Sequence, residues 1–247
     1  MTRRDLLWLV GAMVLAVAAP MSGHAEPNPC EVPADLMEVP VKLPHLAARL
    51  RDKAPVTMVA IGGGSTKGAA AGSPDLAYPH RLQLALAAFY PGVSITVKNE
   101  GVARQSTRQM VERFPADVFP EKPVLVVWET GISDAVRGTD TDEFAAALQA
   151  GIDEVKNRAI DIVLVDMQFS RRAATVIDFE HYLKMIHRVG ELNEVYVFPR
   201  FAMMRYWSEQ NVFNFDEVPE NERTKLAAKV YDCIGRTLAE AIRSAAR

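Results

Sequence analysis

Mostly apolar runs alternate with amphipathic stretches along most of the chain. Runs of this kind are typical of strands that are buried on both faces of a parallel sheet. They lie at residues 56–61, 93–97, 124–128, 160–165 and 195–198. The pattern therefore predicts five parallel strands.

The stretches between these runs have the periodicity of helices. Apolar residues recur three or four positions apart and so share one helical face, in the sets Leu82, Leu86, Phe89 and Phe144, Leu148, Ile152, Val155. Further helices are predicted over 43–53, 176–192 and 225–245. Alternating strands and helices predict a three-layer α/β sandwich, with a five-stranded parallel sheet in a flavodoxin-like arrangement. Ligands bind such sheets beyond the carboxyl ends of the strands.

The N-terminal segment has the organisation of a signal peptide. Arg3 and Arg4 precede an apolar stretch that is short for a membrane span, and small residues end the segment near Ala25. The interpretation is a signal peptide over 1–25 and a periplasmic or secreted protein without a membrane span after processing. An uncleaved N-terminal anchor is the alternative, and the paired arginines leave both the general and the twin-arginine export routes open.

The remaining chain divides into an arm with a short helix, residues 26–54, and one domain, residues 55–247. Its composition, 49% hydrophobic and 24% charged, is ordinary for a globular protein. The net charge of −3 gives no sign of a nucleic-acid-binding surface. Cys30 and Cys233 are its only cysteines. In an oxidising compartment they are expected to form a disulfide, although two unrelated thiols remain the alternative.

Four loops at the predicted strand ends carry small and polar residues in a recognisable order. They are Gly62-Gly63-Gly64-Ser65-Thr66-Lys67-Gly68, Asn99-Glu100-Gly101-Val102-Ala103-Arg104, Thr130-Gly131-Ile132-Ser133-Asp134 and Glu222-Arg223-Thr224-Lys225. This order resembles the SGNH (GDSL-type) hydrolases over nearly the whole mature chain. Flanking sequences resemble one exported bacterial branch of them, namely Tyr78-Pro79, Asp166-Met167-Gln168, Arg200-Phe201-Ala202-Met203-Met204-Arg205 and Tyr231-Asp232-Cys233.

The resemblance implies an ester hydrolase, but the residues that would act are replaced. The family nucleophile is the Ser of Gly-Asp-Ser-x-Thr-x-Gly, and Gly64 stands at that position with Ser65 one residue late. Arg104 stands where the family has an oxyanion-hole Gly, and Ser133 where it has an Asn. The family pair Asp-x-x-His corresponds to Glu222 and Lys225.

No alignment of the last loop supplies the histidine. Asp216 offers a second register, but Pro219 then falls on the histidine position. A Ser hydroxyl is a weak nucleophile without an adjacent base, and a lost oxyanion donor costs about 10²–10³ in rate. The histidines elsewhere in the chain are interpreted as ordinary structural or surface residues, and no metal-ligand spacing or cofactor motif is present. A pseudoenzyme is therefore predicted.

The replacements also suggest a new role for the former cleft. A Gly-rich turn that leads into a helix offers backbone N–H groups to anions, and two cations stand beside it in the alignment. The predicted ligand is an anionic small molecule, such as a carboxylate, a phosphate or an acidic sugar. The predicted ligand-binding residues are Gly63, Gly64, Ser65, Arg104, Ser133, Glu222 and Lys225.

Other interpretations stay open at this point. Arg104 facing solvent and Lys225 paired with Glu222 or Glu220 would leave no anion site. A separate alternative is an interaction or scaffold module with a filled cleft and an unknown exported partner. A third alternative is a weak or altered esterase in which Lys225 activates Ser65, since Ser–Lys variants of the hydrolytic triad exist.

Processing near Ala25 is directly testable. Mass spectrometry of the protein from its native host should give an N-terminus at Glu26 or within a few positions of it, because cleavage follows the small residues. A cytoplasmic protein that begins at Met1 would contradict the signal-peptide prediction.

Overall fold

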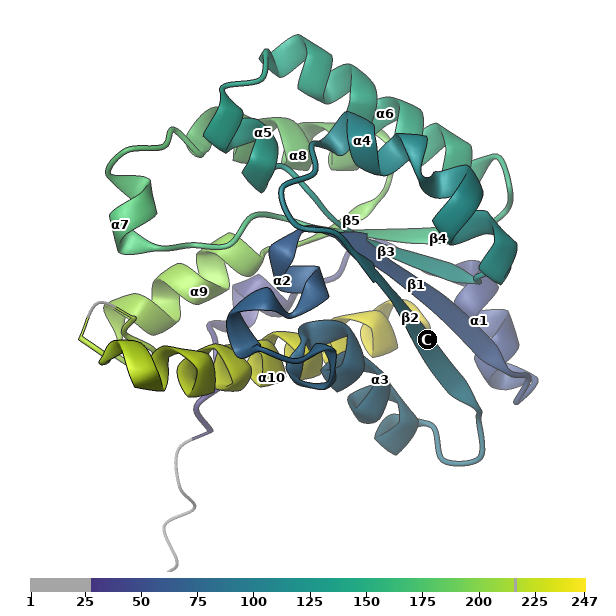
Figure 1. Ribbon diagram of the computed structural model, residues 1–247. Helices are drawn as coiled ribbons and strands as arrows, with labels where there is room; N and C mark the ends of the chain where they lie inside the picture. The colour runs from purple at the N-terminus through teal and green to yellow at the C-terminus, as the bar shows by residue number, and fades with distance from the viewer. Residues whose placement is uncertain (1–27, 216) are drawn as a thin grey trace, which may run out of the picture.

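The computed structural model describes residues 28–215 and 217–247, so the predicted signal peptide lies outside the described residues. The chain forms a single five-stranded parallel sheet in the order β2-β1-β3-β4-β5 (Figure 1). The predicted fold class is confirmed. The strands are β1 (Val56–Gly62), β2 (Ile95–Gly101), β3 (Leu125–Glu129), β4 (Asp161–Val165) and β5 (Tyr196–Phe198).

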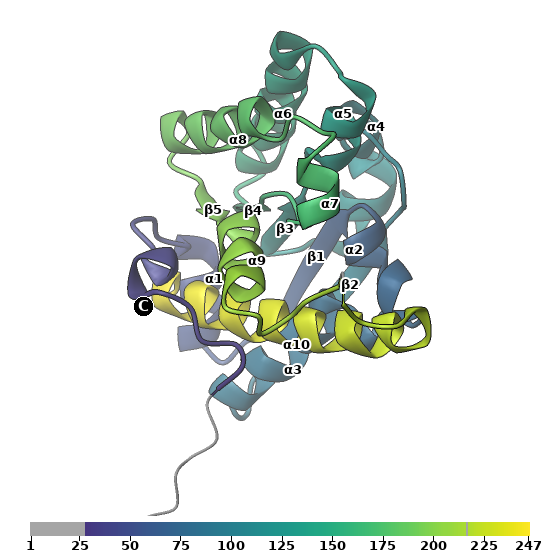
Figure 2. The same cartoon turned by 90° about the vertical axis from the view of Figure 1, so that its left-hand side faces the viewer.

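Helices cover both faces of this sheet (Figures 1 and 2). One face is covered by α1 (Pro44–Arg51), α3 (Tyr78–Phe89), α9 (Arg200–Glu209) and α10 (Glu220–Ala245). The other is covered by α4 (Thr107–Glu112), α6 (Thr141–Lys156) and α8 (Glu180–Leu192). Three short helices lie at strand or loop ends, namely α2 (Gly64–Lys67), α5 (Ile132–Arg137) and α7 (Arg171–Ala174).

The burial of the strands explains why their sequences were recognisable. Every residue of β3 and β4 is buried, as expected for inner strands that contact helices on both faces. β2 is an edge strand and has only one buried residue, Ile95. The apolar positions that predicted the helix over α6, from Phe144 to Val155, are all buried in the core.

Some element boundaries differ from the prediction. The helix predicted from residue 176 begins at Glu180, where the Asp178 carboxylate accepts a hydrogen bond from the Glu180 N–H at 3.0 Å and so satisfies a free helix-end donor. The last helix begins at Glu220 directly after Pro219, five positions before the predicted start at residue 225. The helix α9 was not predicted.

The N-terminal arm is held against the domain at several points. The Cys30–Cys233 disulfide is present and joins the arm to α10, with 4.9 Å between the Cα atoms. The Trp207 indole N–H donates to the Glu31 carbonyl at 2.9 Å. Further along, the Leu43 N–H donates to the Ala245 carbonyl at 3.0 Å. Within the described part of the arm, Ala34–Met37 forms a 3₁₀ turn ahead of α1.

Within the described ranges, no helix has both the length and the apolar character needed to cross a membrane.

Removal of the disulfide is expected to destabilise the fold. The bridge closes a loop across a sequence separation of 203 residues. Loop-entropy models give a stabilisation of about 4–5 kcal/mol for a loop of that size. Removal of a native disulfide typically lowers the free energy of unfolding by about 2–5 kcal/mol. Urea unfolding should therefore show a lower midpoint for the Cys30→Ser/Cys233→Ser variant than for the oxidised wild type. Reduced wild type should resemble the variant, and equal midpoints for all three samples would contradict the expectation.

Candidate functional site

The turn from β1 into α2 carries Gly64 at the position where the alignment predicts the family nucleophile. Gly62 is obligatory, since a Cβ there would lie 2.2 Å from Thr66 Oγ1 and 2.8 Å from Glu129 Cβ. Gly64 is different: a Cβ there would have its nearest neighbours at 3.9 Å, in Ala103 and Ala69. The turn could accommodate a Ser at Gly64, so its absence is not imposed by packing.

Ser65 is buried and already hydrogen-bonded. It is 6% exposed, and its hydroxyl donates to Gln168 Oε1 at 2.7 Å. The Tyr231 hydroxyl lies against the same side chain. Burial raises the pKa of Tyr231, while hydrogen bonds to the Ser65 side chain and to the Ala70 backbone lower it. An amide oxygen is a poor proton acceptor compared with an imidazole, so Gln168 cannot serve as a general base.

Lys225 does not contact Ser65. Its ammonium lies 3.0 Å from Glu222 Oε1, and its side chain is 73% exposed. Both residues belong to the first turns of α10. In the sequence analysis, this pairing was the alternative to an anion site at Lys225. The Ser–Lys pair required by the altered-esterase interpretation is not formed among the described residues.

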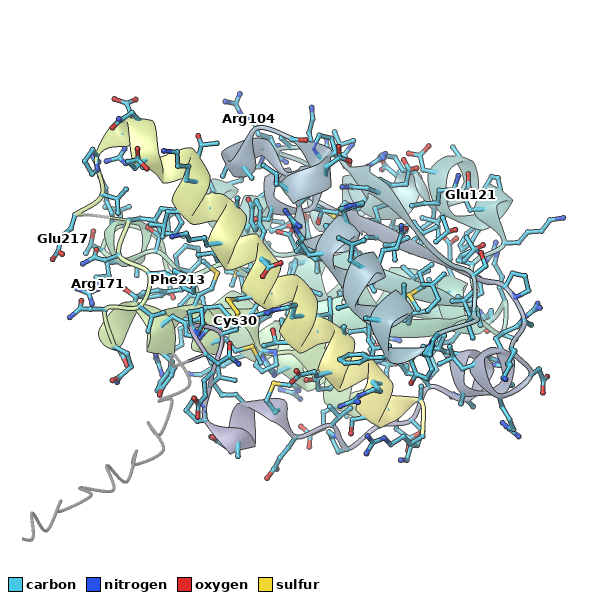
Figure 3. The ribbon with its side chains drawn as sticks, turned by 90° about the horizontal axis from the view of Figure 1, so that it is seen from below. Cys30, Arg104, Glu121, Arg171, Phe213 and Glu217 are labelled. Carbon is cyan, nitrogen blue, oxygen red and sulfur yellow. A yellow bond between two sulfur atoms is a disulfide. The ribbon has the colours of Figure 1, made fainter. Side chains whose placement is uncertain are left out.

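Arg104 and Ser133 occupy positions near the turn without hydrogen bonds from their side chains to it. Arg104 has left-handed backbone (φ 66°) and an exposed side chain, which points away from the body of the protein in Figure 3. Its carbonyl accepts a hydrogen bond from the Arg137 guanidinium. Ser133 is half-buried in the first turn of α5. Across the described ranges, neither Arg104 nor Lys225 has a hydrogen bond to Gly63, Gly64 or Ser65.

A buried ion pair lies directly beneath the turn. Glu129, the last residue of β3, and Arg200, the first of α9, are each 1% exposed, and their side chains approach to 3.1 Å. The other carboxylate oxygen of Glu129 accepts from the Thr66 N–H at 3.1 Å and from the Thr66 hydroxyl at 2.6 Å. The Tyr78 hydroxyl lies 3.0 Å from Thr66 Oγ1, and burial raises the Tyr78 pKa far above its usual value. The network joins α2, α3, β3 and α9.

The carboxyl end of β2 is hydrogen-bonded to the same turn. The Asn99 side chain donates to the Thr66 carbonyl at 2.7 Å and accepts from the Gly101 N–H at 3.0 Å. A Cβ at Gly101 would lie 2.2 Å from the Lys67 backbone nitrogen, so only glycine permits this approach. The scaffold of the hydrolase turn is therefore intact around the replaced residues.

Two histidines pair with carboxylates away from Ser65. His187 Nε2 lies 3.1 Å from Asp166 Oδ2, and the other oxygen of Asp166 accepts from the Phe201 N–H at 2.7 Å. Burial raises the pKa of Asp166, and the hydrogen bond to His187 partly offsets this. His181 pairs with Asp178 at the exposed start of α8. Within the described part of the chain, no histidine hydrogen bonds to Ser65, and no His, Cys, Asp or Glu cluster could hold a metal ion.

A cavity of about 300 Å³ lies next to the residues that contact Ser65, but neither Ser65 nor any other predicted ligand-binding residue lines it. Gln168 and Tyr231, both next to Ser65, line it, and its walls come from the loop after β4, from α9 and from α10. Two of its lining residues are arginines, Arg172 and Arg223. Figure 2 shows that α2, α7 and the first turns of α10 lie on one side of the molecule, beyond the carboxyl ends of the strands.

Several residues of this site escaped the sequence interpretation. Gln168, Tyr231 and Arg200 belonged to the sequences that resemble the exported branch, but nothing there assigned them a contact. Glu129 ends an otherwise apolar strand, and this position in the sequence could have indicated a buried polar network. Arg172 and Arg223 look like ordinary surface arginines, so only the fold could place them at a cavity.

The chain is similar in sequence to one protein family and in fold to several solved structures. The sequence model of the non-GDSL lipase-like family matches residues 29–247. A protein assigned to the lipolytic G-D-S-L family from Desulfitobacterium hafniense DCB-2 superposes with a TM-score of 0.60 and 18% identity, which covers 75% of this chain and 99% of that chain. The acetylxylan esterase Axe2 from Geobacillus stearothermophilus superposes with a TM-score of 0.56 and 20% identity, which covers 73% and 94%.

These similarities confirm the resemblance to SGNH hydrolases at the level of the fold. At such low identities the structures share the architecture, and the activity of the relatives does not transfer with it. No curated protein matches the sequence.

The buried ion pair is expected to contribute strongly to stability. Arg200→Met leaves the Glu129 carboxylate buried without its cation, which should lower the free energy of unfolding by about 3–5 kcal/mol. The double variant Arg200→Met/Glu129→Gln should recover part of this loss, because no unpaired charge is left. Urea unfolding of both variants measures the effect.

A matched control lies on the same helix. Arg205 forms an exposed pair with Glu209 at 3.6 Å, so Arg205→Met should change the free energy of unfolding by about 1 kcal/mol or less. Equal effects of Arg200→Met and Arg205→Met would show that the buried pair does not hold the turn.

Proposed function

The chain belongs to the non-GDSL lipase-like family, and we propose that it is an exported, catalytically inactive member that binds a ligand in the cleft beside Ser65. One observation carries the proposal. Gly64 occupies the nucleophile position in a turn whose neighbouring atoms leave room for a serine. The fold thus retains the frame of a hydrolase site, while the side chain that would attack an ester is absent.

The surroundings of Ser65 support the loss of hydrolysis. A hydroxyl needs a base that accepts its proton as it attacks. The Ser65 hydroxyl donates to an amide oxygen, and Lys225 is paired with Glu222 at the surface. Arg104 and Ser133 stand at two aligned oxyanion positions, and within the described part of the chain their side chains form no hydrogen bond to the turn.

The open cavity favours ligand binding over a purely structural role. A filled cleft is what the scaffold alternative requires, whereas about 300 Å³ of space lies beside Ser65. Small-molecule sites are concave and mostly apolar, with a few polar groups, and volumes of about 300 Å³ and above are usual. The cavity fits that description.

Export is part of the proposal. It rests on the predicted signal peptide, and the Cys30–Cys233 disulfide supports it, because structural disulfides persist mainly in oxidising compartments. Periplasmic or secreted localisation is the expected outcome.

An esterase assay tests the inactive site. Purified mature protein, Ser65→Ala and Lys225→Ala should all leave p-nitrophenyl acetate at the background rate, while an active G-D-S-L esterase assayed in parallel shows that the assay works. Turnover of wild type at about 1 per second or more, a common enzyme rate, would contradict the proposal. If both substitutions also abolished that turnover, the Ser65–Lys225 alternative would be correct.

A further inference from the structure

The cavity beside Ser65 has a positively charged margin. Arg172 belongs to the short helix α7 and Arg223 to the first turn of α10, and both are exposed. Neither forms an ion pair with any residue that the structure describes. Arg171 differs, since its guanidinium is bound to the Ser208 hydroxyl and carbonyl. Two arginines at one opening, both without an ion-pair partner among the described residues, form a suitable site for a single anionic group.

Behind this margin the walls are apolar. Phe169, Met204, Phe215 and Val230 line the cavity. The same four residues also line a second, narrow cavity of about 30 Å³, which ends at Trp207 and Phe213. Trp207 is fully buried, and Phe213 packs edge-on against it with 5.5 Å between ring centroids. In Figure 3, the labelled Arg171, Phe213 and Glu217 lie on the side of the molecule where α10 begins. The two cavities adjoin, so apolar wall continues inward from the two arginines.

We propose that this cavity binds an amphipathic carboxylic acid, with the carboxylate between Arg172 and Arg223 and the apolar chain against Phe169, Met204 and Phe215. The inference rests on the proposed function, because a ligand stays bound only if the site does not hydrolyse it. It also specifies the ligand further: the free acid is preferred over its ester, since only the acid carries the charge that the arginines complement.

The chemistry of the walls distinguishes this ligand from the others that the sequence suggested. An acidic sugar needs hydrogen-bond partners along its whole length, whereas the walls behind Arg172 and Arg223 are mainly apolar. An inorganic phosphate would occupy the margin and leave the apolar wall empty. Gln168 supplies one further polar group, because its oxygen accepts from Ser65 while its amide N–H groups have no partner among the described residues. They are available to donate to a carboxylate.

Binding measurements on the mature protein test the inference. The probes are hexanoate, octanoate and decanoate below their micellar concentrations, with methyl decanoate, inorganic phosphate and galacturonate for comparison. Calorimetry should give tighter binding as the acid lengthens and weak or no binding of the other three probes. Arg172→Ala and Arg223→Ala should each raise the Kd of decanoate roughly tenfold or more, which is the usual effect of losing a charge-assisted hydrogen bond.

Three control variants and one wall variant locate the site. Arg108→Ala removes an exposed arginine of α4, and the decanoate Kd should stay within about twofold of wild type. Arg104→Ala and Lys225→Ala should be equally neutral, although they remove the two cations of the sequence-based anion site. Phe215→Ala, at a half-buried wall position, should reduce the gain in affinity from hexanoate to decanoate. Thermal unfolding of each variant without ligand confirms that it is folded.

The possible failures are separable. Equal binding of decanoate and methyl decanoate, with neutral arginine variants, would overturn the carboxylate and leave an apolar ligand site. Binding of phosphate or galacturonate that is lost in Arg104→Ala and Lys225→Ala would place the anion at the turn and overturn the inference. Absence of binding by every acid would also overturn it. The esterase assay is independent of these outcomes, because it tests the chemistry around Gly64 and not the cavity.

Discussion

The arrangement of the site depends on one buried ion pair, between Glu129 and Arg200. Glu129 ends a central strand, and its carboxylate accepts two hydrogen bonds from Thr66 while it faces the guanidinium. Removing two charges from water is costly, and the cost is offset only when attraction and hydrogen bonds satisfy both groups. The ion pair is therefore stable only while Thr66 of the turn donates its hydrogen bonds to the Glu129 carboxylate. α2, β3 and α9 are fixed relative to one another as a result.

This constraint explains why the backbone of the turn keeps its shape independently of the residue at position 64. A Cβ at Gly62 would lie 2.2 Å from the Thr66 hydroxyl oxygen, and a Cβ at Gly101 would lie 2.2 Å from the Lys67 backbone nitrogen, so both positions require glycine; Asn99 joins the end of β2 to the turn. All of these contacts belong to the scaffold. Gly64 differs, because a Cβ there would have its nearest neighbours at 3.9 Å. A change at this position consequently costs the fold little, whereas a change at its neighbours would disturb the sheet.

The sequence predicted those elements in which buried apolar residues form a continuous run or recur at helical spacing. The inner strands are apolar throughout, and the buried face of α6 repeats at helical spacing, so both were recognisable. The helix α9 was missed because Arg200 at its start and Trp207 near its end are buried for reasons of tertiary contact, one with Glu129 and one with the arm. The Cys30–Cys233 bridge was predictable from two cysteines, since no competing partner exists in the sequence.

The candidate site was harder to predict because an alignment gives the position of a residue along the chain but not the orientation of its side chain. Arg104 and Lys225 align beside the turn, yet one lies exposed on left-handed backbone and the other pairs with Glu222 one helical turn away. Pairs spaced by three or four residues on a helix are close whatever the fold, so a local partner competes with any distant ligand. Arg172 and Arg223 come from segments far apart in the sequence, and no described residue neutralises them. The structural positions of these cations, rather than their alignment, therefore indicate where an anion can bind.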